Sequence, residues 1–320
     1  MLLPLLRSTI VASLLLLSSR LPPPPQPPPS QPSTSFTCLL RNCKKPLLSC
    51  LASPRCARGL LCVTRHEFDP VAQMRCMDLY ETPAMRRFSD CAMTAYQCVP
   101  PLPADEVQEK AFEEARRRVA TLPSLPSPPP LGSFLRGEWR VSLGLNPTFD
   151  TFPCQRHFFA PPSPNAAAAT EATARFTYRV PRSGGSRPLL RSDGRTFTVP
   201  DPANPRFWRV KPDPPYLGYV ESWLFLGGQP NDPSDPWFAV RYFGRNAAWS
   251  GFGGANVYTR SGLPPAAPGA VEAMERALEI GGMKREDMVA VDNRCEEEEG
   301  FVWVSRWQTR LGVGRAAPFK

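Results

Sequence analysis

Between residues 137 and 260, apolar and polar residues alternate in short segments, as they do in half-buried β-strands. Turn-forming residues such as Asp201-Pro202 and Asn231-Asp232-Pro233 separate the segments. This pattern predicts strands at Glu138–Leu143, Gln155–Phe159, Thr173–Val180, Leu189–Leu190, Arg195–Val199, Arg206–Lys211, Tyr216–Leu226, Trp237–Phe243 and Ala255–Tyr258. About eight antiparallel strands of this kind close a barrel that is wide enough for one small or elongated apolar ligand.

Two other segments follow the period of an α-helix, at Ala104–Ala120 and Ala270–Ile280. The first has acidic residues in its first turn and Arg116–Arg118 in its last, which complements the helix dipole. Its apolar stripe consists of Val107, Ala111, Phe112, Ala115 and Val119. We expect this stripe to dock the preceding domain on the barrel.

Eight of the ten cysteines lie close together, at Cys38, Cys43, Cys50, Cys56, Cys62, Cys76, Cys91 and Cys98. An even, dense set behind an export-like signal is typical of disulfides. Zinc is the alternative, but it prefers Cys-x-x-Cys pairs, and no two of these cysteines have that spacing. Short apolar runs predict three or four brief helices, which need crosslinks because so small a core is not stable alone.

Composition divides the chain further. Its 41 prolines cluster around residues 21–32, 100–103, 122–131 and 161–164, where they exclude helix interiors. The run Ser8–Ser19 is too short to cross a bilayer but suits the hydrophobic part of an export signal. We therefore expect a targeting signal and Pro-rich linker at 1–36, a cysteine-rich disulfide domain at 37–100, a helix and linker at 101–131, a barrel at 132–262, and a C-terminal helix and tail at 263–320.

The net charge of +9 is spread along the chain without an aromatic-interleaved basic stripe. This distribution argues against nucleic-acid binding. It is compatible with a modest attraction to anionic lipid surfaces.

Three sequence strings carry a family resemblance. Gly137-Glu138-Trp139 is the Gly-x-Trp that begins the first strand of lipocalins, where the tryptophan plugs the closed end of the barrel. Asn146-Pro147-Thr148-Phe149-Asp150 and the Gly-rich string from Tyr242 to Gly254 are longer. With them, the chain from about Cys38 to Cys295 resembles the violaxanthin de-epoxidases and their relatives. The resemblance implies a mainly β fold: a lipocalin-like eight-stranded antiparallel barrel with a small disulfide-rich helical N-terminal domain and a C-terminal helix.

The resemblance also implies a pairing of the cysteines. The implied disulfides are Cys38–Cys56, Cys43–Cys50, Cys62–Cys76, Cys91–Cys98 and Cys154–Cys295, the last of which ties the tail to the barrel. All ten cysteines are then structural. The glutamate-rich tail of the family is reduced here to Glu296–Glu299, and the segment Phe301–Trp307 is expected to form an extra strand-like piece.

De-epoxidation requires a proton on the epoxide oxygen and then electrons from a reductant. A carboxylic acid inside an apolar barrel can supply the proton, because desolvation raises its pKa. Alignment of Tyr216–Trp223 with the family places Glu221 where the enzymes have an aspartate and implies that Glu221 is the general acid. Tyr242 falls at the family's tyrosine beside the ligand. The alternative is that Glu221 is an outward, solvated strand residue and Tyr242 a core tyrosine.

Four aromatic residues, Trp139, Tyr219, Trp223 and Trp249, are candidates for contact with a rigid polyene, the alternative being core and barrel ends. Asp150 and His157 match family positions implicated in activation at low pH. Their protonation would loosen a neutral-pH conformation and expose a dimer or membrane surface. The alternative for His157 is a hydrogen-bonded structural histidine.

The expected function is therefore that of an oxidoreductase that reduces a xanthophyll epoxide with ascorbate in the chloroplast thylakoid lumen, without a metal. One alternative is a non-catalytic lipocalin-type binder of carotenoid or another apolar molecule. Another is a secreted, disulfide-rich interaction module with a purely structural barrel.

Overall fold

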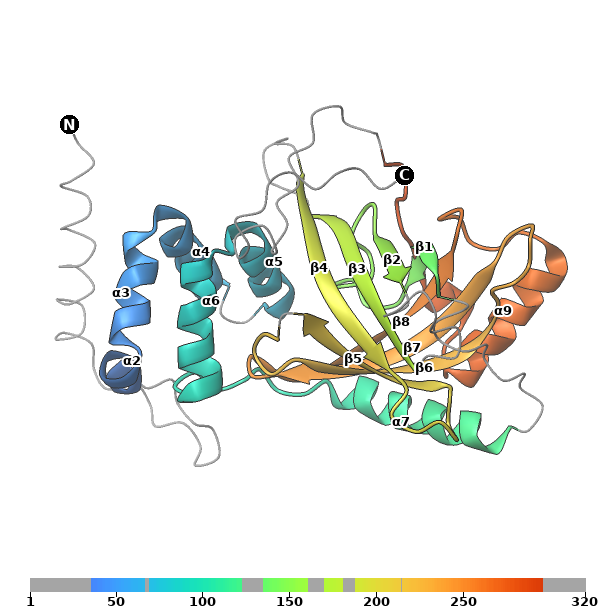
Figure 1. The fold of residues 1–320 in the computed structure, drawn as a ribbon, viewed down its shortest axis with the longest axis horizontal. Helices are drawn as coiled ribbons and strands as arrows, with labels where there is room; N and C mark the ends of the chain where they lie inside the picture. Colours follow the sequence, from blue (N-terminus) through green and yellow to red (C-terminus); the bar gives the residue numbers. More distant parts are fainter. Residues whose placement is uncertain are drawn as a thin grey trace.

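Figure 1 shows a computed structural model of the chain, in which residues 36–66, 69–122, 135–160, 170–180, 188–213 and 215–295 are described. The expected export signal, the prolines at 161–164, most of the linker at 122–131, Glu296–Glu299 and the strand-like piece Phe301–Trp307 lie outside these residues.

An eight-stranded antiparallel barrel forms the larger part of the molecule (Figure 1). Its strands are β1 (Gly137–Gly144), β2 (Arg156–Ala160), β3 (Glu171–Val180), β4 (Leu189–Thr198), β5 (Phe207–Asp213), β6 (Val220–Gln229), β7 (Trp237–Asn246) and β8 (Trp249–Thr259). Each strand pairs with the next, and β1 pairs with both β2 and β8, which closes the barrel. The short β9 (Val289–Ala290) pairs with β1 on the edge opposite β8, beyond the residues of β1 that pair with β2.

Three strand predictions need correction. The predicted strand Tyr216–Leu226 begins only at Val220, because Leu217 and Gly218 have positive φ and form a turn. The predicted segments Leu189–Leu190 and Arg195–Val199 belong to one continuous strand, β4. Its Asp193-Gly194 pair has the composition of a turn, but here both residues are paired with β3. The predicted strand Ala255–Tyr258 begins already at Trp249. Its glycines have low β-propensity and obscured the start of the strand.

Aromatic side chains fill the barrel interior. Trp139 is fully buried, with its ring 4.8 Å from that of Phe238 in an edge-to-face arrangement. The Arg260 guanidinium covers the Trp139 ring at 3.8 Å. Further along, the Phe238 ring stacks on Tyr258 at 4.6 Å, and Tyr258 stacks on Trp223 at 5.8 Å. The tryptophan of the Gly-x-Trp string thus closes one end of a packed barrel.

Helix α7 (Glu106–Thr121) packs on the outside of the barrel, and the expectation that it docks the N-terminal domain is wrong. Phe112, Ala115 and Val119 are buried in one cluster with residues of β6, β7, β8 and α9 (Pro268–Ile280). Val107 is 74% exposed, so the buried stripe is narrower than predicted. The helix therefore covers the barrel wall beside α9.

Arg241 on β7 joins these two helical elements. Its guanidinium is buried and donates to the Gly281 carbonyl at 2.6 Å and to Gln108 Oε1 at 2.8 Å. Gly281 ends α9 and Gln108 lies on α7. One charged side chain thus fixes the position of both helices on the barrel wall.

The N-terminal domain contains more helices than predicted. The described part has α2 (Phe36–Asn42), α3 (Lys44–Ala52), α4 (Pro54–Arg65), α5 (Pro70–Tyr80) and α6 (Pro83–Ser89), followed by a π-helical turn, Asp90–Ala95. Ser53, Asp69 and Thr82 accept backbone hydrogen bonds as N-caps, and each precedes a proline. A proline in the first turn begins a helix rather than separating two, which explains the underestimate.

The disulfides confirm two predicted pairs and correct three. Cys62–Cys76 and Cys154–Cys295 are present as expected. The predictions Cys38–Cys56, Cys43–Cys50 and Cys91–Cys98 are wrong: the bonds are Cys38–Cys98, Cys43–Cys91 and Cys50–Cys56. Helix α2 packs against the π-helical turn, which brings Cys38 and Cys43 to partners far along the chain. Within the described residues every cysteine is paired.

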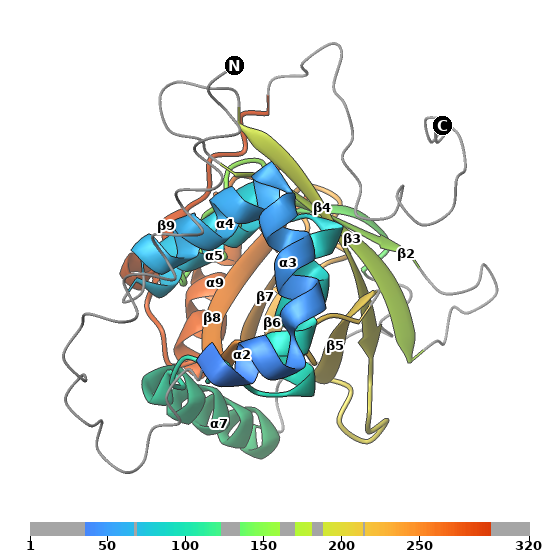
Figure 2. The same cartoon turned by 90° about the vertical axis from the view of Figure 1, so that its left-hand side faces the viewer.

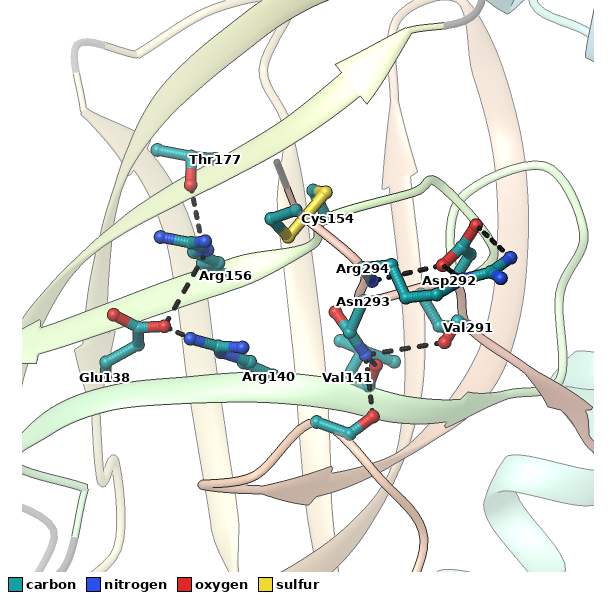
Figure 3. The surroundings of a disulfide bond; sticks show 12 residues. Glu138, Arg140, Val141, Cys154, Arg156, Thr177, Val291, Asp292, Asn293 and Arg294 are labelled. Carbon is teal, nitrogen blue, oxygen red and sulfur yellow. Dashed lines mark hydrogen bonds and ion pairs between the residues drawn. A yellow bond between two sulfur atoms is a disulfide. The ribbon is translucent and has the colours of Figure 1, made fainter. Parts of the chain in front are cut away.

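The tail returns to the barrel through Cys154–Cys295, whose surroundings are shown in Figure 3. Asn293 donates its amide to the carbonyls of Val141 at 2.7 Å and Gly262 at 2.9 Å. The tail is thereby fixed to β1 and to the loop after β8.

The N-terminal domain docks on the barrel through α5 and α6. Glu81 pairs with Arg191 of β4 at 3.7 Å, and both side chains are less than a tenth exposed. Arg75 covers the Phe152 ring at 4.5 Å, and Arg86 covers the Tyr216 ring at 4.6 Å. These contacts hold the domain beside β3, β4 and the loop that precedes β6.

Candidate functional site

Glu221 and Tyr242 lie on adjacent strands and face the barrel interior. Glu221 is opposite Gly244, and Trp223 is opposite Tyr242. Because side chains alternate along a strand, these four positions share the inner face. Glu221 is 6% exposed, so it is not the solvated outward residue of the alternative interpretation.

Two buried carboxyl groups each accept a hydrogen bond from a tyrosine hydroxyl. The Tyr219 hydroxyl donates to Glu221 Oε2 at 2.8 Å. The Tyr242 hydroxyl donates to Asp150 Oδ1 at 2.8 Å, and the Asn146 amide donates to Asp150 Oδ2 at 2.8 Å. The structure thus adds Asp150 to the predicted pair of Glu221 and Tyr242.

Burial raises the pKa of both carboxyl groups and so favours their protonated forms. It raises the pKa of Asp150 from 3.8 to about 7, against the hydrogen bonds from Asn146, Tyr242 and Asn256. Burial also raises the pKa of Glu221 above 4.5, against the Tyr219 hydroxyl and the charge of Arg195. For Asp150, the neutral form stabilises the fold fully below pH 3.8, and this contribution is lost as the pH rises through about 7.

The tyrosines act as neutral donors. Burial raises the pKa of Tyr219, Tyr242 and Tyr258 well above 10. Around an incoming polar atom, the site therefore offers hydroxyl protons and, below neutral pH, carboxylic protons. This donor set can protonate or hydrogen-bond an acceptor oxygen of an otherwise apolar ligand.

Glycines make room for the Asp150–Tyr242 pair. A Cβ atom on Gly254 would lie 2.5 Å from the Tyr242 hydroxyl and 2.7 Å from Asp150 Oδ2. A Cβ atom on Gly144 would lie 2.4 Å from that of Asp150. The Gly-rich string on β8 is therefore part of the site.

Gly254→Ala is expected to displace the Asp150–Tyr242 pair and to lower the free energy of unfolding by about 1–3 kcal/mol, because the added methyl group meets buried polar atoms. Urea unfolding measures the change. Gly269→Ala is the matched control, since nothing lies near its added Cβ atom. Equal stability of the two variants would contradict the proposed packing.

Arg195 was not predicted as a site residue, although the period of β4 places it on the inner face with Asp193 and Phe197. Its side chain is 14% exposed and pairs with Asp193 at 3.7 Å. The guanidinium lies 5.2 Å from the Tyr219 ring centroid. Asn256 and Tyr258 were missed likewise. The same alternation along β8, with polar side chains in an apolar strand, is the signal that identifies them.

His157, the other residue of the predicted pH switch, is buried in the barrel. The His157 ring stacks on Phe176 with 3.5 Å between centroids. Burial, aided by the charge of Arg195, lowers its pKa well below 6.5. The neutral imidazole thus stabilises the fold above pH 6.5, and that contribution is lost only as the pH falls through the lowered pKa. Acidification therefore acts on Asp150 and His157 in opposite directions.

The four aromatic residues predicted to bind substrate lie along the barrel rather than around one point. Trp139 is at the level of Phe238 on β7, whereas Glu221 is opposite Gly244, six residues further, or about 20 Å. Trp223 lies between these levels and packs edge-to-face on Phe197 at 5.0 Å. Tyr219 donates a hydrogen bond to Glu221. Trp249 packs against Phe149 and Phe252 at the same end of the barrel as Glu221.

Two other features do not form a site for an apolar ligand. A hollow of about 450 Å³ lies on the outer face of α7, but it is lined mainly by charged side chains. Cys62, His66 and Cys76 lie close enough to hold a metal, but the two cysteines are joined in a disulfide and offer no thiolate.

The chain is similar to several known proteins. The profile of the VDE lipocalin domain matches residues 35–293. The chloroplastic violaxanthin de-epoxidase of Arabidopsis thaliana is 30% identical over 275 residues, which cover 83% of this chain and 54% of that protein. The chloroplastic violaxanthin de-epoxidase of Spinacia oleracea is 30% identical over 277 residues, which cover 83% of this chain and 52% of that protein. The chain thus spans about half the length of these relatives. The structure of apocrustacyanin C2 aligns with 60% of this chain and with 89% of the apocrustacyanin chain, at 12% sequence identity and a TM-score of 0.36.

Proposed function

Because the chain belongs to the violaxanthin de-epoxidase (VDE) lipocalin family, we propose that it is an oxidoreductase that reduces a xanthophyll epoxide with ascorbate. The observation that carries the proposal is the buried Glu221 carboxyl, which has a raised pKa and lies on the strand beside Tyr242. An acid of this kind keeps its proton in mildly acidic solution and can deliver it inside an apolar barrel.

In the proposed reaction, Glu221 protonates the epoxide oxygen as a ring C–O bond breaks. Ascorbate supplies two electrons and two protons in all: one proton completes the water molecule and the other reprotonates Glu221. The second C–O bond breaks, and the products are a C=C bond, water and dehydroascorbate. Tyr219 orients the Glu221 carboxyl through its hydrogen bond. Tyr242 orients the ligand or relays a proton, and Asp150, bonded to the Tyr242 hydroxyl, returns that proton.

The aromatic packing requires one further condition. Since aromatic side chains fill the interior, a polyene enters only when some of them move. We propose that protonation of His157 in acidic solution weakens its stacking on Phe176 and permits this rearrangement, and that a homodimer forms under the same conditions.

The proposed compartment is the chloroplast thylakoid lumen. Two observations support it: the matched relatives are chloroplastic, and five disulfides require an oxidising environment.

The second candidate function is a non-catalytic binder of carotenoid or another apolar molecule. Glutamate in place of the family's aspartate favours it, because the extra methylene moves the acid by about 1.5 Å, and misplacement on this scale costs on the order of a hundredfold in rate. Incubation of the oxidised protein with violaxanthin, galactolipid and ascorbate near pH 5, followed by chromatography of the pigments, separates the two functions. A binder retains the pigment unchanged.

The rate of de-epoxidation is expected to be highest on the acidic side and to fall as the pH rises through the raised pKa of Glu221, because only its protonated form donates. A profile of kcat against pH measures this limb. The pigment must be checked at each pH in the absence of protein, since acid alone opens epoxides. A rate that increases toward alkaline pH is incompatible with Glu221 as the acid.

A further inference from the structure

Arg195 lies inside the barrel close to Glu221. On β4, Phe197 is opposite Val210 of β5, and Val210 is opposite Glu221 of β6. Arg195 is the next position along β4 that shares the inner face with Phe197. Its guanidinium lies 5.2 Å from the centroid of the Tyr219 ring, whose hydroxyl donates to Glu221. A positive charge thus lies beside the acid of the proposed reaction.

The charge of Arg195 is only partly balanced. Asp193 pairs with it at 3.7 Å, and the two side chains are 5% and 14% exposed. This distance is longer than that of a direct hydrogen bond. One N–H of Arg195 donates to the Gly194 carbonyl at 3.1 Å, but its buried Nε–H has no acceptor among the residues that the structure describes. A buried guanidinium with an unused donor can stabilise a further negative charge nearby.

Asp193 is itself held by a contact that reaches the N-terminal domain. The Tyr178 hydroxyl lies 3.3 Å from Asp193 Oδ2, the oxygen that pairs with Arg195, and 3.4 Å from Asp78 Oδ1 on α5. Helix α5 contacts β3, the strand of Tyr178 (Figure 1), and Figure 2 shows the helices of this domain in front of the barrel strands. The position of Arg195 therefore depends on contacts that cross from one domain to the other.

We propose that Arg195 stabilises the Glu221 carboxylate that remains when the acid gives up its proton, and that Asp193 and Tyr178 are positioning residues for Arg195. An acid inside an apolar barrel holds its proton strongly, because its anion is poorly solvated. A fixed cation stabilises that anion as it forms and so favours proton transfer to the ligand. The proposal rests on the proposed role of Glu221, through which Arg195 acts without touching the ligand.

Titration of the Glu221 carboxyl tests this arrangement without pigment or reductant. The oxidised full chain is labelled with carbon-13 at its glutamate carboxyls, and Glu221→Gln identifies the Glu221 resonance by NMR. Arg195→Gln should move the titration midpoint to higher pH, because the carboxylate loses a neighbouring cation. Asp193→Asn should move it to lower pH, because the charge of Arg195 is no longer balanced. Tyr178→Phe should act in the same direction but less, since Asp193 keeps its carboxyl and loses one hydrogen bond.

Other titratable groups lie around Glu221 and Arg195. They are Tyr219 on β6, Tyr242 on β7, Tyr258 on β8, Asp150 in the loop after β1, Asp193 on β4 and His157 on β2. The tyrosines stay neutral below pH 10, and His157 stays neutral until the pH falls well below 6.5. Asp150 titrates at about pH 7, so each midpoint is also measured in the Asp150→Asn background.

The pH profile of kcat gives a second readout. In Arg195→Gln, the alkaline limb should move to higher pH while the maximum rate falls on the order of tenfold, because Glu221 keeps its proton longer and transfers it less readily. Arg195→Lys retains the charge and should restore both quantities towards wild type. A change that only disturbed the barrel would lower the rate without moving the limb.

Arg209→Gln is the matched control, since Arg209 is exposed on the neighbouring strand β5, and it should leave the midpoint unchanged. Circular dichroism verifies folding of each variant, and if Arg195→Gln does not fold, the opposite shift in Asp193→Asn decides. A midpoint that stays in place or moves to lower pH in Arg195→Gln overturns the proposal, as does an equal shift in the control. If the midpoints move as expected but wild type does not turn over violaxanthin, the proposed function fails, whereas the coupling of Arg195 to Glu221 stands.

Discussion

Replacement of Glu221 by glutamine is expected to lower the rate of de-epoxidation by about 10²–10⁴-fold while pigment binding remains intact. The amide keeps the shape of the carboxyl, and its oxygen still accepts the Tyr219 hydrogen bond. It cannot donate a carboxylic proton. Separate measurement of kcat and of the pigment dissociation constant distinguishes loss of the acid from loss of the barrel.

Two comparison variants make this result specific. Glu221→Asp should preserve or raise the rate, because it restores the acid position of the resembling enzymes. Glu272→Gln, at a solvated position on α9, should behave as wild type. If Glu221→Gln turns over as fast as wild type, Glu221 has no part in the mechanism. If wild type is inactive and Glu221→Asp gains activity, the protein is a binder built on an enzyme scaffold.

Reduction with dithiothreitol is expected to unfold the N-terminal domain and to abolish activity. Four of the five disulfides lie within it, and each contributes on the order of 3 kcal/mol. The cysteines are also part of its core: Cys43, Cys50 and Cys56 are three of the seven buried residues in that cluster. Circular dichroism and the pigment assay, before and after reduction, measure the loss.

The control variant, Cys154→Ser with Cys295→Ser, removes only the barrel's crosslink and should leave the helical signal unchanged. A count of free thiols in the denatured, oxidised protein should give none. Two or more thiols per chain would contradict complete pairing, and unchanged dichroism and activity after reduction would show that the disulfides are not structural.

The sequence predicts the elements whose signals are local. Alternation identifies most strands, and the helical period of apolar residues identifies α7 and α9 to within a few residues, with charge at both ends as a further signal for α7. The disulfide pairing could not be derived this way, because it depends on how α2 packs against the turn at Asp90–Ala95. Likewise, nothing local in Val107 shows that its side of α7 faces solvent.

The site residues also divide into those that the sequence identifies and those that depend on tertiary contacts. Glu221 and Tyr242 follow from the family resemblance, and the structure brings them to neighbouring positions. Asp150 enters the site because its loop folds back into the space beside Gly254, a tertiary contact without a sequence period. Arg195 could have been found from the alternation along β4, had the strand been predicted as continuous.

The pairing of β1 with β8 has a consequence for how the chain folds. Val141 of the first strand pairs with Tyr258 of the last, so the barrel cannot close until the whole barrel segment has formed. Closure through contacts so distant in sequence is slow. Helices α2 to α6 and the turn at Asp90–Ala95 contact one another within residues 36–98 and can pack while the barrel is still open. Their eight cysteines can therefore pair among themselves first. Cys154 and Cys295 meet only on closure, and this order of events limits mispairing among ten thiols.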